Sequence, residues 1–302
     1  MKLNNWLSII SFTTTLSISA QTVELPKTLF EYPMAPDSLP TLTDKTSYIV
    51  LRFWDKCDFK KALEDENEFG KAFNDYVSFM PYANIDSVKL SVTKLMNRLS
   101  KEPKHTLAIA RAAENALYGP EAEFTGDEIY LMFARSVLSN KKIKEVDKVR
   151  YLEQTRILNG SILGAGAPAL TYTTRYGATH QLHDQTGEFI VLFFNDPDCD
   201  ECSMIKLRLS ADVAVNNMLK SGRLKIVTIY SGEPDDNWKQ KMSDVPYEWE
   251  VGANPEADTV YDLRKMPNIY LLDSERKIIG KDMSTDQILN LAAYLNQHVS
   301  PQ

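Results

Sequence analysis

The chain has 302 residues, 43% of them hydrophobic, and its 41 acidic and 34 basic side chains give a net charge of −7. This length is enough for two domains, each with a core of its own. An acidic chain without basic clusters is a poor partner for nucleic acid or for an anionic membrane surface, so we expect neither.

The first twenty residues have the pattern of a secretory signal peptide. Lys2 supplies a positive charge, a mildly apolar stretch runs from Trp6 to Ile18, and small residues lead to Ala20. We expect cleavage after Ala20 and a periplasmic or secreted mature protein. No cysteine precedes Cys57, which argues against a lipid-anchored signal. No later run reaches the roughly 18 apolar residues of a membrane span, so none is expected after cleavage.

Residues 21–160 are predicted to form a helical domain. One buried stripe falls at helical spacing, and its members are Ile85, Val88, Val92, Leu95, Met96 and Leu99. A second helix starts near Pro103, and a third opens with Thr125 and Glu128 at the spacing of a capping box. A fourth covers about 145–158. Together these segments indicate a helical bundle without obvious chemistry.

The stretch "LRFWDKCDF" (Leu51–Phe59) is the most unusual part of this half. Phe53 and Trp54 are expected in a core or an interface. Cys57 is the odd cysteine, because it has no neighbour in the sequence. It is interpreted either as a buried or half-exposed free thiol or as a resolving partner for another cysteine.

The pattern changes at "GSILGAGAPAL" (Gly160–Leu170), where three glycines and Pro168 end the helical periodicity. Residues 161–302 then alternate strand-like and helix-like segments, which predicts a mixed sheet covered by helices. Strands are expected at 178–183, 188–194, 223–230, 247–251, 268–273 and 277–280. Helices are expected from Cys199 to about Lys220 and at 234–242, 255–264 and 284–297, the last capped by Ser284 and Gln287.

Two of the three cysteines lie in "NDPDCDEC" (Asn195–Cys202), directly after a buried strand. A helix is expected to begin there, and its N-terminus would stabilise a thiolate. Cys202, Ile205 and Leu209 share an apolar face, so Cys202 should point inward and Cys199 should be accessible. Thiol–disulfide exchange needs this arrangement, in which one thiolate attacks and a sheltered partner resolves.

Three segments resemble the thioredoxin-like superfamily, in its extracytoplasmic branch of thiol–disulfide oxidoreductases: "GAPAL", "YGATHQLHDQTGEFIVLFFNDPDCDEC" and "KMPNIYLLDSERKIIG". The resemblance implies a thioredoxin-like α/β domain over 161–302, with Cys199 as the nucleophile and Cys202 as the resolving thiol. It also implies a cis peptide before Pro267, which would contact substrate together with Met266. No organic cofactor or metal is implied. The expected partners are exported protein or small-molecule disulfides and an upstream thiol donor.

The N-terminal half resembles a helical domain of unknown function found ahead of such domains, through "FWDKCDF". That resemblance carries little functional information.

The sequence departs from the thioredoxin pattern around the cysteines. Asp198, Asp200 and Glu201 surround Cys199, and the buried acid of thioredoxin would fall at Phe193. Carboxylates destabilise a neighbouring thiolate and hence the reduced form. We therefore expect a reducing rather than a strongly oxidising pair.

Other interpretations stay open at this point. The pair could be a structural disulfide in a non-catalytic binding module, or the reactive centre of a thiol peroxidase. A zinc site would combine the pair with His180 and His183, which have ligand-like spacing. A cysteine–histidine hydrolase would need an oriented histidine beside one cysteine, and nothing in the sequence marks such a set.

Overall fold

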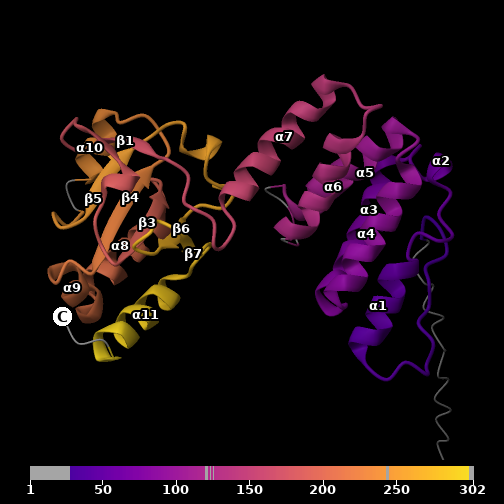
Figure 1. The fold of residues 1–302 in the computed structure, drawn as a ribbon, viewed down its shortest axis with the longest axis horizontal. Helices are drawn as coiled ribbons and strands as arrows, with labels where there is room; N and C mark the ends of the chain where they lie inside the picture. The colour runs from indigo at the N-terminus through magenta and orange to yellow at the C-terminus, as the bar shows by residue number, and fades with distance from the viewer. Residues whose placement is uncertain (1–27, 120–121, 123, 125, 243–244, 299–302) are drawn as a thin grey trace, which may run out of the picture.

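The computed structural model describes residues 28–298 except 120, 121, 123, 125, 243 and 244. The predicted signal peptide therefore lies outside the described residues. Figure 1 shows a helical domain beside an α/β domain, with helix α7 leading from one to the other. Within the described residues, no helix combines the length and the apolar character that a membrane span requires.

The helical domain is a bundle around one aromatic-rich core. Phe53 and Trp54 lie in that core, as predicted, and are 0% and 6% exposed. The elements are α1 (Leu42–Arg52), α2 (Phe59–Ala62), α3 (Glu66–Ser78), the 3₁₀ helix η1 (Met80–Tyr82), α4 (Ile85–Leu99), α5 (Pro103–Leu117), α6 (Asp127–Ser139) and α7 (Glu145–Gly160).

The "FWDKCDF" stretch forms the turn between α1 and α2. The guanidinium of Arg98 donates hydrogen bonds to the carbonyl oxygens of Trp54 at 2.9 Å and Cys57 at 3.1 Å. The same group lies over the ring of Phe59, 5.0 Å from its centroid. Arg98 thus satisfies carbonyl groups that a turn leaves without helical partners.

Two local predictions in this domain need correction. Ile85 is 47% exposed, because it is the first residue of α4 and the buried part of that helix begins at Val88. Thr125, the predicted cap of α6, lies outside the described residues. The N-cap of α6 is Gly126, so the helix begins one residue later than the capping box requires.

The α/β domain contains one mixed seven-stranded sheet in the order β2-β1-β5-β4-β3-β6-β7. Strands β3, β4 and β5 are parallel, and the other pairings are antiparallel. The prediction of a helical bundle followed by a thioredoxin-like α/β domain with a mixed sheet is confirmed. The strands are β1 (Thr171–Thr174), β2 (Thr179–Gln181), β3 (Phe189–Asn195), β4 (Leu224–Tyr230), β5 (Glu250–Ala253), β6 (Asn268–Leu272) and β7 (Ile278–Gly280).

Each face of this sheet has a separate apolar core, because successive residues of a strand point to opposite faces. The first face carries Val191 and Phe193 of β3 and is covered by helices. The second carries Ile190 and Phe194 and packs against the segments that flank the sheet. The remaining helices are η2 (Leu182–Asp184), α8 (Asp200–Ala211), α9 (Val213–Lys220), α10 (Asp236–Met242), η3 (Ala257–Thr259) and α11 (Thr285–His298).

Two predicted helices of this domain differ in the structure. The helix after Cys199 divides into α8 and α9 at Asp212, whose side chain accepts a hydrogen bond from the Val215 amide at 2.9 Å and caps α9. Within the predicted helix at 255–264, only the short 3₁₀ helix η3 forms. The residues after it leave the helical path, and the side chains of Tyr261 and Asp262 are buried. Helix α11 does begin with the predicted reciprocal cap of Ser284 and Gln287.

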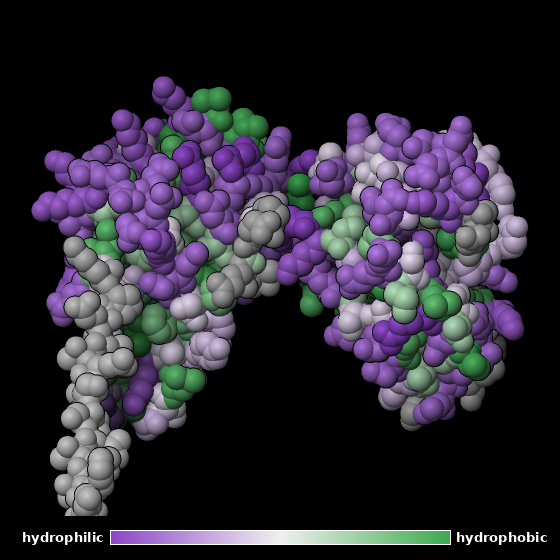
Figure 2. Space-filling model, turned by 180° about the vertical axis from the view of Figure 1, so that it is seen from behind, coloured by the Kyte–Doolittle hydropathy of each residue, from purple (hydrophilic) through white to green (hydrophobic). Residues whose placement is uncertain are grey.

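Figure 2 shows a largely hydrophilic surface and two domains that touch across a narrow region. Hydrophobic side chains gather at the top of the helical domain in this view. Helix α7 carries the exposed apolar side chains of Val146, Val149 and Leu152, of which Val146 is 75% exposed.

Candidate active site

The candidate site lies where strand β3 ends and helix α8 begins. All but the first of the seven residues of β3 are buried, and β3 pairs with β4 on one side and β6 on the other. Such a central, apolar strand is a rigid support for the loop that follows it. That loop is closed by a turn in which the Asp198 amide donates to the Asp196 carboxylate at 2.7 Å.

Cys199 and Cys202 form a disulfide at the N-terminus of α8, with their Cα atoms 5.2 Å apart. Cys199 is the N-cap residue, and its sulfur accepts a hydrogen bond from the Cys202 amide at 3.0 Å. Cys199 is partly exposed. Cys202 is 0% exposed and packs with Phe193 and Leu209. The predicted difference between the two cysteines is thus present: Cys199 is partly exposed, and Cys202 is buried.

The cis peptide predicted from the resemblance is present between Met266 and Pro267. Strand β6 begins at Asn268, which pairs with Phe194 in the antiparallel register. Pro267 is therefore level with Asn195, at the end of the sheet from which the cysteine loop departs. Met266 is partly buried against the second face of the sheet, whereas Cys199 packs against the first. A contact between Met266 and substrate stays a prediction.

The three carboxylates around Cys199 are not equivalent. Asp200 and Glu201 are exposed in the first turn of α8. Asp198 forms an ion pair with Lys241 of α10. Lys241 offsets the charge of one of the three carboxylates. The sequence did not predict this ion pair, because it depends on how α10 packs beside the loop.

A buried polar pair on the first face was also missed. Asn195, 1% exposed, donates to the Thr228 hydroxyl at 2.6 Å and to the Ile229 carbonyl at 3.2 Å. Its side chain shares a face with Phe193, which is 0% exposed. The sequence feature that could have predicted this pair is an asparagine at the end of an apolar strand. The pair joins β3 to β4 directly below the cysteine loop.

The structure does not bring the cysteine pair together with the histidines of the zinc hypothesis. His180 lies on the edge strand β2, and its ring nitrogen Nδ1 is 2.7 Å from a carboxylate oxygen of Glu250. Three strands separate β2 from β3, which at the usual strand spacing is roughly 19 Å. Within the described residues, no group of three or more potential ligands could hold a metal ion.

A groove of about 370 Å³ lies between the start of α8 and the end of α10, and neither cysteine lines it. Pro197 and Ser203 line it on the side of the cysteines, and Lys241 and Pro246 line it on the side of α10.

A family model for a domain of unknown function, DUF5106, matches residues 10–160, which is half of the chain. The chain belongs to the DUF5106 family. The DUF5106 domain thus accounts for the helical half, as the resemblance of "FWDKCDF" suggested, and its description assigns no activity. No curated protein matched the chain.

The solved structures that resemble the chain cover either most of it or somewhat less than half of it. A thioredoxin-like protein from Bacteroides caccae is 23% identical, covers 89% of this chain and 99% of its own, and has a TM-score of 0.72. This likeness establishes the thioredoxin-like fold. The C-terminal domain of an uncharacterized protein from Bacteroides fragilis is 31% identical, over 44% of this chain and 99% of its own, with a TM-score of 0.42. The thioredoxin domain of a thiol-disulfide oxidoreductase from Bacteroides vulgatus is 22% identical, over 45% of this chain and 99% of its own, with a TM-score of 0.40.

Cys57 lies in the core of the DUF5106 domain and is 2% exposed. Burial raises the pKa of its thiol to about 12, against the opposing charge of Arg98. The Cys199–Cys202 pair belongs to the core of the other domain. Cys57 is thus a free, buried thiol, which is the first of the two predicted interpretations.

Proposed function

We propose that this protein is an extracytoplasmic thiol–disulfide oxidoreductase that reduces or isomerises disulfides through Cys199 and Cys202. One observation carries the proposal: a partly exposed cysteine at a helix N-terminus is bonded to a fully buried one, level with a cis-proline loop. The substrates would be exported proteins or small-molecule disulfides. The predicted signal peptide supports a periplasmic or secreted location, where an upstream thiol donor would keep the pair reduced.

The exchange would take two steps. In the reduced protein, the Cys199 thiolate attacks one sulfur of the substrate disulfide, forms a mixed disulfide and releases the other sulfur as a thiolate that takes up a proton. Cys202 then loses its proton and attacks Cys199, which restores the Cys199–Cys202 disulfide and releases the second substrate thiol. Two electrons pass from the protein to the substrate, and the thiol donor returns them.

A redox titration of the mature protein tests this proposal. The protein would be equilibrated in graded dithiol buffers, and its free thiols would be trapped by alkylation and counted by mass. We expect Cys199 and Cys202 to titrate together and reversibly, near the roughly −270 mV of thioredoxin. A pair that stays oxidised well below about −300 mV would be a structural disulfide, and the binding-module alternative would replace the proposal.

Asp200 and Glu201 should make the pair more reducing. Replacing Asp200→Asn and Glu201→Gln together removes two exposed charges near the Cys199 thiolate. The rate of Cys199 alkylation at pH 7 should then rise about three- to tenfold, and the reduction potential should rise with it. Lys241→Gln, which exposes the charge of Asp198, should act in the opposite direction. If high salt does not weaken these effects, their origin is not electrostatic.

A further inference from the structure

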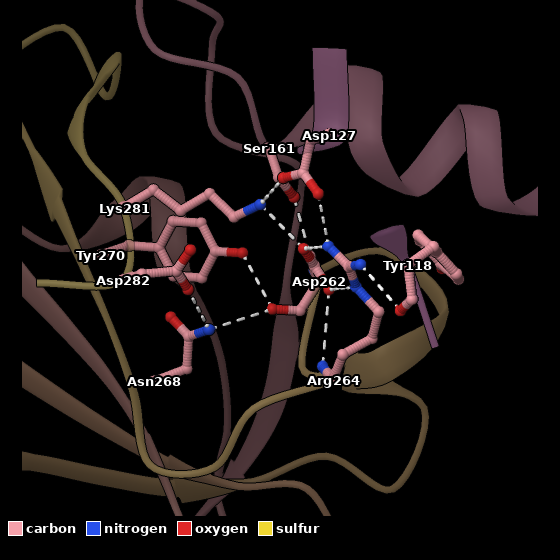
Figure 3. Close-up of polar contacts among 9 residues, drawn as sticks. All are labelled: Tyr118, Asp127, Ser161, Asp262, Arg264, Asn268, Tyr270, Lys281 and Asp282. Carbon is pink, nitrogen blue, oxygen red and sulfur yellow. Dashed lines mark hydrogen bonds and ion pairs between the residues drawn. The ribbon is translucent and has the colours of Figure 1, made fainter. Parts of the chain in front are cut away.

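The contact between the two domains is centred on a cluster of charged side chains, shown in Figure 3. Asp262 and Arg264 come from the segment between η3 and β6, and Lys281 follows β7. Asp127 is the first residue of α6 and is the carboxylate that the helical domain contributes. Its two oxygens accept hydrogen bonds from Arg264 Nη2 and Lys281 Nζ, both at 2.7 Å. One carboxylate thus joins both cations of the other domain.

Arg264 is held on every side of its guanidinium group. Nε and Nη2 donate to the two oxygens of Asp262 at 2.7 and 2.6 Å, which is the bidentate geometry that arginine favours. Nη1 donates to the Tyr118 carbonyl at 2.9 Å, and the group lies 4.0 Å from the centroid of the Tyr118 ring. The Arg264 side chain is only 21% exposed. Its position is therefore set jointly by both domains.

This cluster holds the loop that carries the cis peptide. Arg264 lies three residues before Pro267, and Asn268 follows directly after it. The side-chain Nδ2 of Asn268 donates to the Asp282 carboxylate at 2.8 Å and to the Asp262 carbonyl at 3.2 Å. The loop is thus tied on one side through Arg264 to the helical domain and on the other to the sheet.

A cavity of about 140 Å³ at this junction borders the loop. Tyr118 and Asp127 of the helical domain line it together with Arg264, Lys265 and Asn268. Residues on both sides of Met266–Pro267 therefore face space that the two domains share. A shift of Asp127 would change the support of the loop from this side.

We propose that the helical domain positions the substrate-binding loop of the exchange reaction through Asp127. Asp127 holds Arg264, and Arg264 holds the Met266–Pro267 segment level with the cysteine loop. Asp127 and Arg264 are positioning residues, because they act through the loop. This inference rests on the proposed function, and it gives the helical domain a role in binding protein substrates.

The test compares Asp127→Asn and Asp127→Ala with Glu128→Gln in the full mature chain. Glu128 is the matched control, since it lies in the same first turn of α6 but pairs with Lys89 at 2.6 Å within the helical domain. Insulin serves as a protein disulfide, and an aromatic disulfide, dithiobis(nitrobenzoate), serves as a small one. Asp127→Ala removes the charge-assisted bonds from both Arg264 and Lys281. The loss of the bond to Arg264 should raise KM for insulin about tenfold. The kcat for insulin and the turnover of the small disulfide should stay within about twofold of the wild type, and the reduction potential should not change. Glu128→Gln should leave all of these quantities, and KM, unchanged.

Hydrogen exchange gives a second readout that does not depend on turnover. The backbone amides of residues 263–266 and of Asn268 should exchange faster in Asp127→Asn than in the wild type, while Glu128→Gln leaves them unchanged. The positioning role would be overturned if Asp127→Ala and Glu128→Gln had equal KM values for insulin. It would also be overturned if Asp127→Ala lost the same fraction of its turnover on insulin and on the small disulfide. A wild type that turns over neither disulfide would instead overturn the proposed function, together with the inference that rests on it.

Discussion

Replacing Cys199 with serine is expected to abolish disulfide reduction. A serine hydroxyl does not ionise near neutral pH, so the nucleophile is lost and turnover should fall by at least about a thousandfold. Cys202→Ser should instead stop the reaction after the first step, because nothing then attacks the mixed disulfide. The measurement is the turnover of a protein disulfide together with the mass of the trapped adduct on Cys199.

Cys57→Ala is the matched control for these two variants. The Cys57 thiol is buried, and its pKa is raised to about 12, so at pH 8 it is almost entirely protonated and unreactive. Turnover and the redox titration should stay as in the wild type, and alkylation of the native, reduced wild type should modify Cys199 before Cys57. An absence of mixed disulfide in Cys202→Ser, or a changed titration in Cys57→Ala, would contradict the assigned roles.

Asp262→Ala is expected to destabilise the protein by about 3–5 kcal/mol, because truncating one member of a buried charge cluster leaves its partners uncompensated. The Asp262 side chain is 5% exposed, and those of its partners Arg264 and Lys281 are 21% and 13% exposed. Removing Asp262 leaves the two cations with Asp127 alone. The measurement is the free energy of unfolding in denaturant. Asp286→Ala is the control, since its pair with Arg208 lies at the surface and should contribute about 0–1 kcal/mol.

The effect of Asp262 should depend on pH. Burial alone would raise the pKa of its carboxyl, but the hydrogen bonds and charges of Arg264 and Lys281 outweigh burial and lower the pKa from 3.8 to about 2. A lowered pKa stabilises the folded state above the unfolded-state value, and this contribution disappears as the pH falls to the folded-state value. The stability difference between wild type and Asp262→Ala should therefore be constant above about pH 5 and narrow from about pH 4 to about pH 2. A difference that does not vary over this range would show that Asp262 acts through packing.

Much of the fold was predictable, because apolar periodicity reports which face of an element is buried. Strand β3, helix α4 and the cap of α11 follow directly from local pattern. The prediction of a helix at 255–264 was wrong, because contacts with distant parts of the chain decide the structure of that segment. Its residues have helical propensity, but Tyr261 fills the second core and Asp262 pairs with Lys281 from beyond β7. Tertiary contacts outweighed local propensity there.

The sequence by itself determined the chemistry that the candidate site can offer. Two cysteines three residues apart, after a buried strand and before a helix with an apolar face, place one sulfur outside and one inside. The tertiary structure alone decided what surrounds that pair. Lys241 reaches Asp198 across 43 residues, and Asp127 reaches Arg264 across 137. Such pairs depend on how elements dock in three dimensions, and a charged side chain at the surface carries no local pattern that names its partner.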